Sequence, residues 1–180
     1  MPAVENSTFF EASEKLETLF LSNNTHLLTS QRDSSNAFDR EINTLDKEEA
    51  AIKVVYFWQD DCPCDQFTQP HFALLANEYR QVVFYLASIN GEVRASQWPS
   101  VKIFPTAWVD IVRSDIQATP AVGIWDASGQ LVYFGPHSLG YICNNDTSFV
   151  KKIIDALLNQ QSVSASSVLG DGCFCRVNHN

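Results

Sequence analysis

Basic residues are scarce in this sequence of 180 residues. Lys and Arg together number 12 against 21 Asp and Glu, which gives a formal net charge of −9 and a pI near 4.7. A surface that binds nucleic acid or an anionic membrane needs clustered Lys and Arg to attract phosphate groups. We therefore expect no nucleic-acid partner, and we interpret the acidity as that of an ordinary protein surface.

Long apolar runs are missing as well. No stretch approaches the roughly 20 apolar residues of a transmembrane helix, and Met1–Asn6 lacks the basic and apolar regions of a signal peptide. We expect no membrane span in this sequence. The cysteines and the Ser-, Asn- and Gln-rich surface nevertheless favour a periplasmic or other extracytoplasmic location over the cytoplasm, because an oxidising compartment preserves disulfides.

The length and a hydrophobic content of 45% suit one globular domain with appendages. Residues 51–160 form the predicted main domain. Residues 161–180 are predicted to be a flexible Ser-rich linker that ends in a Cys-x-Cys tail. Residues 1–50 are predicted to be a helical extension, whose second helix runs from Phe38 to about Ala51 and whose first carries an apolar face of Phe9, Phe10, Leu16, Leu19, Phe20 and Leu21.

The most informative stretch runs from Val54 to Cys64. Strand-forming residues end at an acidic turn and lead into two cysteines and a predicted helix over residues 65–79. The free N–H groups and the positive dipole at a helix N-terminus stabilise a thiolate. Because Pro63 suits the first helical position, we expect Cys62 to be the exposed cap residue and the nucleophile.

The second cysteine of this stretch, Cys64, is predicted to lie inside the first helical turn. Residues two apart on a helix point about 200° apart, so a Cys62–Cys64 disulfide would be strained and easily exchanged. Asp65 follows directly. It is either a proton acceptor or, as we expect, a solvated surface carboxylate, because exposed acids are the rule.

The cysteines form two Cys-x-Cys pairs and one single residue, namely Cys62 and Cys64, Cys173 and Cys175, and Cys143. An odd number in a chain of this length argues against a purely structural disulfide framework. Redox chemistry or metal binding is favoured instead. The predicted flexible linker would let the tail thiols reach the first pair.

The rest of the pattern predicts alternating strands and helices. A second buried strand at residues 82–86 completes a parallel β-α-β unit, and residues 121–134 predict a β-hairpin. Between them, residues 90–117 are too apolar for a solvated loop and predict a packed segment with a short helix. A last helix is predicted from Ser148 to about Gln160.

The residues before Cys62, Phe57-Trp58-Gln59-Asp60-Asp61, resemble the active-site lead-in of the thioredoxin family, and Pro70 falls where that family's kinked helix carries a proline. The family's Cys-Gly-Pro-Cys is replaced here by Cys62-Pro63-Cys64-Asp65, so the second thiol comes one position earlier. Thr119-Pro120, just before the predicted hairpin, resembles the family's cis-proline, which leaves the preceding backbone free to pair with an extended substrate. A bacterial thioredoxin-like branch with a Cys-Pro-Cys motif and a cysteine-rich tail is similar.

This resemblance implies an α/β, thioredoxin-like fold over residues 51–160, with a central mixed β-sheet flanked by helices. It also implies a thiol–disulfide oxidoreductase that acts on protein or small-molecule disulfides with a thiol redox partner and no bound cofactor. Cys62 would attack the substrate disulfide, and Cys64 or a tail thiol would resolve the mixed disulfide. The other implied site residues are the relay thiols and the supporting residues, Cys143, Cys173, Cys175, Thr119, Pro120, Trp58, Pro63 and Asp65.

Two alternatives stay open. The first is a copper(I)- or zinc-binding protein that uses Cys62 and Cys64 with His137 or Cys143, since thiolates and imidazole suit those metals. The second is a thioredoxin-fold interaction module without turnover, which is favoured if Cys62 is buried. A peroxidase is disfavoured, because the Pro-x-x-x-Thr-x-x-Cys pattern of thioredoxin-like peroxidases is absent before Cys62.

Overall fold

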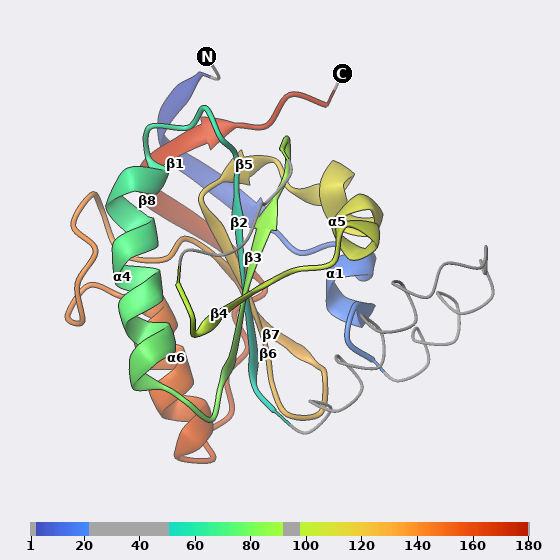
Figure 1. Ribbon diagram of the computed structural model, residues 1–180, viewed down its shortest axis with the longest axis vertical. Coiled ribbons are helices and arrows are strands. Elements are labelled where there is room, and N and C mark those ends of the chain that lie inside the picture. Colours follow the sequence, from blue (N-terminus) through green and yellow to red (C-terminus); the bar gives the residue numbers. More distant parts are fainter. Residues whose placement is uncertain (1–2, 22–50, 92–97, 180) are drawn as a thin grey trace.

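A central five-stranded sheet organises the computed structural model, which describes residues 3–21, 51–91 and 98–179 (Figure 1). The strand order is β4–β3–β2–β6–β7. Strands β2, β3 and β4 are parallel, β6 is antiparallel to β2, and β7 is antiparallel to β6. The bounds are β2 Lys53–Trp58, β3 Val83–Ser88, β4 Val101–Ile103, β6 Ala121–Trp125 and β7 Leu131–Gly135.

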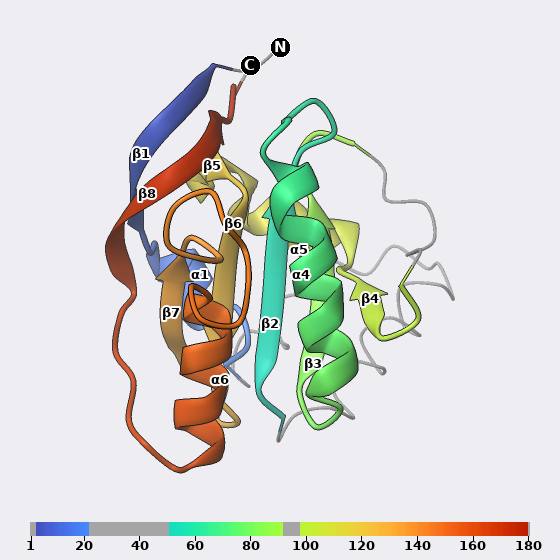
Figure 2. The ribbon, with the colours of Figure 1, turned by 90° about the vertical axis from the view of Figure 1, so that its left-hand side faces the viewer.

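Helices cover both faces of this sheet (Figures 1 and 2). One face carries α4 (Asp65–Glu78) and α6 (Phe149–Leu158), and the other carries α1 (Glu14–Thr18) and α5 (Thr106–Val112), which continues into the 3-10 turn η1 (Arg113–Asp115). The succession β2–α4–β3, then the hairpin β6–β7, then α6, is thioredoxin-like. The predicted fold class is therefore confirmed for the main domain.

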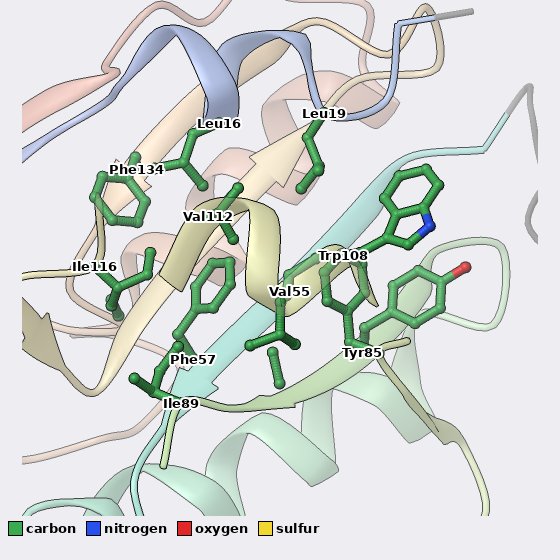
Figure 3. Close-up of a cluster of buried hydrophobic side chains, with 14 of the residues drawn as sticks. Leu16, Leu19, Val55, Phe57, Tyr85, Ile89, Trp108, Val112, Ile116 and Phe134 are labelled. Atoms are coloured by element: carbon green, nitrogen blue, oxygen red, sulfur yellow. The ribbon is translucent and has the colours of Figure 1, made fainter. Parts of the chain in front are cut away.

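Strand β2 lies at the centre and is buried on both faces. Successive side chains of a strand point to opposite faces of its sheet. Val55 and Phe57 pack with residues of α1 and α5 in one apolar cluster, part of which Figure 3 shows. Val54 and Tyr56 pack with residues of α4 and α6 in a second cluster on the other face. This explains why the sequence of β2 is almost continuously apolar, as parallel strands between two helical layers usually are.

A second, smaller sheet closes one side of the domain. It consists of β1 (Val4–Glu11), β8 (Ser167–Arg176) and β5 (Ala118–Thr119) in the order β1–β8–β5. Strand β8 lies in the middle and is antiparallel to both neighbours. The first and last strands of the described chain are therefore adjacent, as Figure 2 shows.

The predicted N-terminal helical extension is wrong for residues 4–11. Phe9 and Phe10 belong to β1, because β8 supplies a pairing partner that local periodicity cannot reveal. Helix α1 is short, and its Leu16 is fully buried. The Trp125 Nε1–H group donates a hydrogen bond of 2.9 Å to the carbonyl oxygen of Leu16, which fixes α1 to the sheet. Most of the second predicted helix, Phe38 to about Ala51, lies outside the described residues.

The Cys-rich C-terminal region is present, but the prediction that it is flexible is wrong. The Ser-rich segment before β8 runs along the edge strand β7, where the Ala165 N–H donates to the Val132 carbonyl and the Phe134 N–H to the Ala165 carbonyl. Strand β8 then pairs with β1 from Ser167 to Cys175. Two neighbouring backbones satisfy the hydrogen bonds of this segment, so its polar composition does not leave it unfolded.

Other predicted elements are confirmed where the structure describes them. The hairpin is β6–β7, the second buried strand is β3, and the packed segment contains α5, with Trp108 and Val112 buried. Across the described ranges, we find no helix that combines the length and the apolar character needed to cross a bilayer.

Phe10 connects the two sheets, since its ring packs edge-on against Phe134 of β7 and Phe174 of β8. Its side chain is 3% exposed, whereas that of Phe9 is 56% exposed. We predict that Phe10→Ala lowers the free energy of unfolding by about 3–5 kcal/mol, as for other buried aromatic residues. Phe9→Ala is the matched control and should change it by less than about 0.5 kcal/mol. Urea denaturation of the oxidised protein measures both, and equal losses would contradict this account of β1.

Candidate functional site

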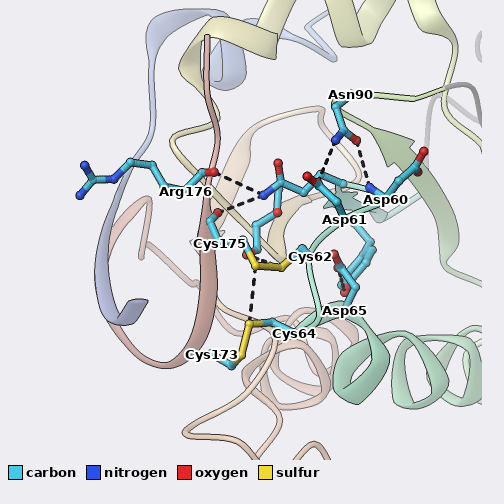
Figure 4. Close-up of a disulfide and its surroundings, with 12 residues drawn as sticks. Asp60, Asp61, Cys62, Cys64, Asp65, Asn90, Cys173, Cys175 and Arg176 are labelled. Carbon is cyan, nitrogen blue, oxygen red and sulfur yellow. Dashed lines mark hydrogen bonds between the residues drawn. A yellow bond between two sulfur atoms is a disulfide. The ribbon is translucent and has the colours of Figure 1, made fainter. Parts of the chain in front are cut away.

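Two disulfides join the start of α4 to β8. Cys62 is bonded to Cys175, and Cys64 is bonded to Cys173, with Cα–Cα distances of 5.8 Å and 5.3 Å. Both separations lie in the usual range for disulfides. Figure 4 shows the two cysteines of β8 facing the two cysteines that flank Pro63. The site is thus built from two Cys-x-Cys motifs more than 100 residues apart.

The geometry of β8 explains the cross-pairing. Alternate residues of a strand project from the same face, so Cys173 and Cys175 both point toward α4. Cys175 is held in register by Val4 of β1 and by Thr119 of β5. The Gln59 side-chain amide donates a hydrogen bond of 3.3 Å to the Cys175 carbonyl oxygen and so connects β8 to the end of β2. No local pattern in the sequence indicates this contact of Gln59 with a strand more than 100 residues away.

The sulfur atoms lie close together across the two disulfides. The Sγ atoms of Cys64 and Cys175 are 3.8 Å apart, although they belong to different disulfides. The sulfurs of Cys62, Cys64 and Cys175 all lie within 4.8 Å of one another. Sulfurs of different disulfides are therefore in van der Waals contact.

The predicted geometry of the first motif is wrong in three respects. Cys62 is 5% exposed instead of open to solvent, because β8 covers it. The cap residue of α4 is Cys64, and the helix begins at Asp65. The expected strained Cys62–Cys64 bond is not formed, because β8 offers each cysteine a partner at a normal disulfide separation.

The Thr119–Pro120 peptide bond is cis, as predicted. Thr119 is fully buried, and its carbonyl oxygen lies 3.6 Å from the Cys62 sulfur. The backbone before the proline, which the resemblance leaves free for an extended substrate, pairs instead with Cys175 and Arg176 of β8. Strand β8 therefore occupies the place beside Cys62 where a substrate strand was expected.

Asp65 is buried, so the prediction of a solvated carboxylate is wrong. Its Oδ1 atom accepts a hydrogen bond of 2.6 Å from the Tyr56 hydroxyl, and its Oδ2 atom is buried without a hydrogen-bond partner among the described residues. Burial raises the pKa of Asp65 from 3.8 to about 7, although the Tyr56 hydroxyl opposes this rise. A carboxyl group with such a pKa can take up or release a proton near neutral pH.

His137 and Cys143 lie apart from the group of three close sulfurs. His137 is 2% exposed, and its Nε2 atom is 2.7 Å from Nδ1 of His71. Burial and the nearby His71 lower the pKa of His137 to about 3, which keeps its ring neutral. Cys143 is a free thiol 3.1 Å from the Ser138 hydroxyl.

The predicted metal set is therefore not assembled, since among the described residues only Cys62, Cys64 and Cys175 form a compact group of metal-ligating atoms. His137 and Cys143 instead line a small cavity that also reaches Cys64 and Cys173. The two other predicted supporting residues lie before the first cysteine motif and within it. Trp58 is half-buried at the end of β2, and Pro63 is exposed between the two cysteines.

Comparisons with known proteins agree with this fold. The model of a family described as "Domain of unknown function (DUF6436)" matches residues 30–177. No curated protein matches the sequence. A hypothetical protein from Sinorhizobium meliloti is 16% identical with a TM-score of 0.56, over 76% of this chain and 85% of that one. An uncharacterized conserved protein from Geobacillus kaustophilus is 20% identical with a TM-score of 0.50, over 73% and 78%.

A third similar structure is the thioredoxin domain of a thiol-disulfide oxidoreductase from Bacteroides vulgatus. It is 16% identical with a TM-score of 0.44, over 64% of this chain and 84% of that chain. At these identities the first two structures support the fold alone.

The buried Asp65 predicts a pH dependence of stability. The pKa of Asp65 is higher in the folded protein than in the unfolded chain, so protonation of its carboxyl group favours the folded state. This contribution to the free energy of unfolding is complete below about pH 4 and is lost as the pH rises toward 7. A rise of the pKa from 3.8 to about 7 corresponds to roughly 4 kcal/mol. Asp65→Asn cannot ionise and should flatten the loss of stability between pH 4 and 7.

The measurement is urea denaturation at several pH values. Asp171→Asn, at an exposed carboxyl on β8, is the control and should keep the wild-type pH profile. If Asp65→Asn also kept that profile, the carboxyl group would not hold its proton in the folded protein.

Proposed function

The chain belongs to the family described as "Domain of unknown function (DUF6436)", and because that description names no activity, we propose a function from the site: a thiol–disulfide oxidoreductase whose resolving thiols lie on β8. The observation that carries this proposal is the cross-pairing of the two Cys-x-Cys motifs. Each cysteine at the start of α4 is bonded to a cysteine of β8, and the sulfurs of Cys64 and Cys175 are 3.8 Å apart.

The cycle begins with all four cysteines reduced. The Cys62 thiolate attacks a substrate disulfide, which forms a mixed disulfide and releases one substrate thiolate. The Cys175 thiolate then attacks the Cys62 sulfur, forms the Cys62–Cys175 bond and releases the second substrate thiolate. The substrate has gained two electrons, and the inner pair, Cys62 and Cys175, has lost them.

The disulfide then moves to the outer pair, Cys64 and Cys173. The Cys64 thiolate attacks the Cys175 sulfur across the gap of 3.8 Å and releases the Cys62 thiolate. Cys173 next attacks Cys64, which forms the Cys64–Cys173 bond and releases Cys175. Because Cys173 is half-buried while Cys62, Cys64 and Cys175 are buried, an external dithiol is best able to reach the outer pair and reduce it.

Asp65 follows Cys64 directly and supports proton movement in this cycle. Each thiolate that is released must take up a proton or be stabilised as an anion. Burial raises the pKa of the Asp65 carboxyl to about 7, so it can carry a proton near neutral pH. Its place at the first residue of α4 puts it in the same helical turn as the Cys64 thiol.

Substrate access requires β8 to leave Cys62. Reduction removes both covalent connections between β8 and the start of α4, whereas the pairing with β5 involves only Ala118 and Thr119. An extended segment of a protein substrate can then take the place of β8 beside Thr119.

The partners are thus a protein disulfide and a thiol redox partner. We further propose an extracytoplasmic location, for example the periplasm, because oxidising compartments preserve disulfides.

A second candidate is an interaction module without turnover. The observation that favours it is the burial of Cys62, which is 5% exposed beneath β8. In this case both disulfides only hold the C-terminal strand β8 covalently against the start of α4. The two candidates differ in whether the disulfides exchange with external thiols.

We predict that limited reduction opens the Cys64–Cys173 bond before the Cys62–Cys175 bond. Thiolates attack the more accessible sulfur faster, and Cys173 is the half-buried member of the four. Alkylation after short exposure to a dithiol, followed by mass mapping, should label Cys64 and Cys173 first among these cysteines. The Cys64 thiolate can afterwards exchange with the inner disulfide, so the first attack is identified by trapping the mixed disulfide with the reductant. Trapping of the reductant on Cys62 or Cys175, instead of on Cys64 or Cys173, would contradict the proposed order of electron transfer.

We also predict catalysis of disulfide reduction with a dithiol donor. Wild-type protein should reduce a fluorescent peptide disulfide above the uncatalysed background, and Cys62→Ser should abolish this activity. Cys64→Ser should still reduce one substrate equivalent and then slow by about tenfold or more, because the inner disulfide can no longer move outward. Asp171→Asn, an exposed change on β8, is the control. A wild-type protein without turnover would support the interaction module.

A further inference from the structure

The four cysteines of the site form a potential ligand set as well as two disulfides. Three of their sulfurs, from Cys62, Cys64 and Cys175, lie within 4.8 Å of one another. The fourth, from Cys173, is bonded to Cys64 and completes the set when that bond opens. We propose that the fully reduced protein binds one zinc ion through the thiolates of Cys62, Cys64, Cys173 and Cys175.

The spacing between the two disulfides fits a tetrahedral zinc site. Zinc–thiolate bonds are about 2.3 Å long, so neighbouring sulfurs of a tetrahedral site lie about 3.8 Å apart. The Cys64 and Cys175 sulfurs, which are not bonded to each other, are already 3.8 Å apart. Reduction lets the two bonded pairs of sulfurs separate toward the same spacing, because non-bonded sulfurs cannot stay at the bond length of about 2 Å.

The elements that carry the ligands hold them in place. Cys62 and Cys64 lie at the start of α4, and Cys173 and Cys175 project from the same face of β8. Strand β8 is paired with β1 along almost its whole length through backbone hydrogen bonds, which reduction of the disulfides does not break chemically. The two pairs of ligands therefore approach one point from two separate elements, as in closed structural zinc sites with four cysteines.

The chemistry and burial of the site suit a soft cation. Four thiolates without an open coordination position are typical of zinc sites that hold a fold together. Three of the four side chains are buried, at 5%, 1% and 0% exposure for Cys62, Cys64 and Cys175. The exposed Asp60 and Asp61 just before the motif add negative charge nearby, which also favours a cation.

Zinc binding goes beyond the proposed function and competes with it. The same thiolates cannot attack a disulfide while they coordinate a metal, so zinc should protect the reduced protein from oxidation and alkylation. The oxidised protein has no thiolate among these four cysteines and should not bind zinc at this site. Binding to the reduced protein requires no turnover, so its test is independent of the oxidoreductase assay.

The experiment is an anaerobic titration of fully reduced, full-length protein with cobalt(II) as the spectroscopic probe, followed by zinc. We expect one equivalent of cobalt to produce the intense visible bands of a tetrahedral thiolate site, and zinc to displace it. Cys173→Ser and Cys175→Ser should each weaken binding by more than about 100-fold, which exceeds the usual loss from removing a merely supporting contact. Cys143→Ser is the matched control and should bind like the wild type.

Circular dichroism of each reduced variant, with and without zinc, shows whether the fold is intact before its affinity is interpreted. Absence of the cobalt bands in reduced wild-type protein would overturn the proposal. So would equal affinity of wild type and a folded Cys173→Ser variant, or equal binding by the oxidised protein. A reduced protein that binds zinc as expected but shows no turnover when it is free of metal would keep the zinc site and reject the oxidoreductase.

Discussion

The pairing of β8 with β1 and β5 is the interaction on which the rest of the site depends. It holds Cys173 and Cys175 against the start of α4 and places β8 beside Thr119. Closing the loop of about 113 residues with one disulfide lowers the entropy of the unfolded chain and contributes roughly 4–5 kcal/mol. The second disulfide closes almost the same loop and adds little to that effect. As restraints on the unfolded chain, the two disulfides are therefore largely redundant.

Much of the fold could be predicted from local patterns in the sequence. The apolar run of β2, the turn and the helical spacing after Cys64 predict the strand and helix that carry the first motif. The hairpin β6–β7 follows from two short apolar runs around a turn. The position of Thr119-Pro120 just before that hairpin predicts its cis peptide bond. These predictions are correct because each element is determined by residues close together in the sequence or by a regular alternation of apolar side chains.

The parts that could not be predicted depend on partners far away in the chain. The apolar residues of β1 fit a helical face as well as a strand, and only the register with β8 decides between them. The local geometry of Cys62 and Cys64 suggested a strained ring, because no local pattern indicates that β8 supplies two other sulfurs. Asp65 has the sequence context of a surface acid, but it is buried in the folded protein, where the hydroxyl of Tyr56 on β2 donates a hydrogen bond to it.

The separation of the two cysteine motifs also sets the order in which the site is made during synthesis. Cys62 and Cys64 leave the ribosome 113 and 109 residues before their partners. At ordinary elongation rates this interval lasts roughly 5 to 20 s. Throughout that time the nascent chain exposes two unpaired thiols at the start of a helix, with no strand to cover them. Correct pairing must therefore wait for the final strand, and any earlier bond between Cys62 and Cys64 would have to be exchanged before the native disulfides form.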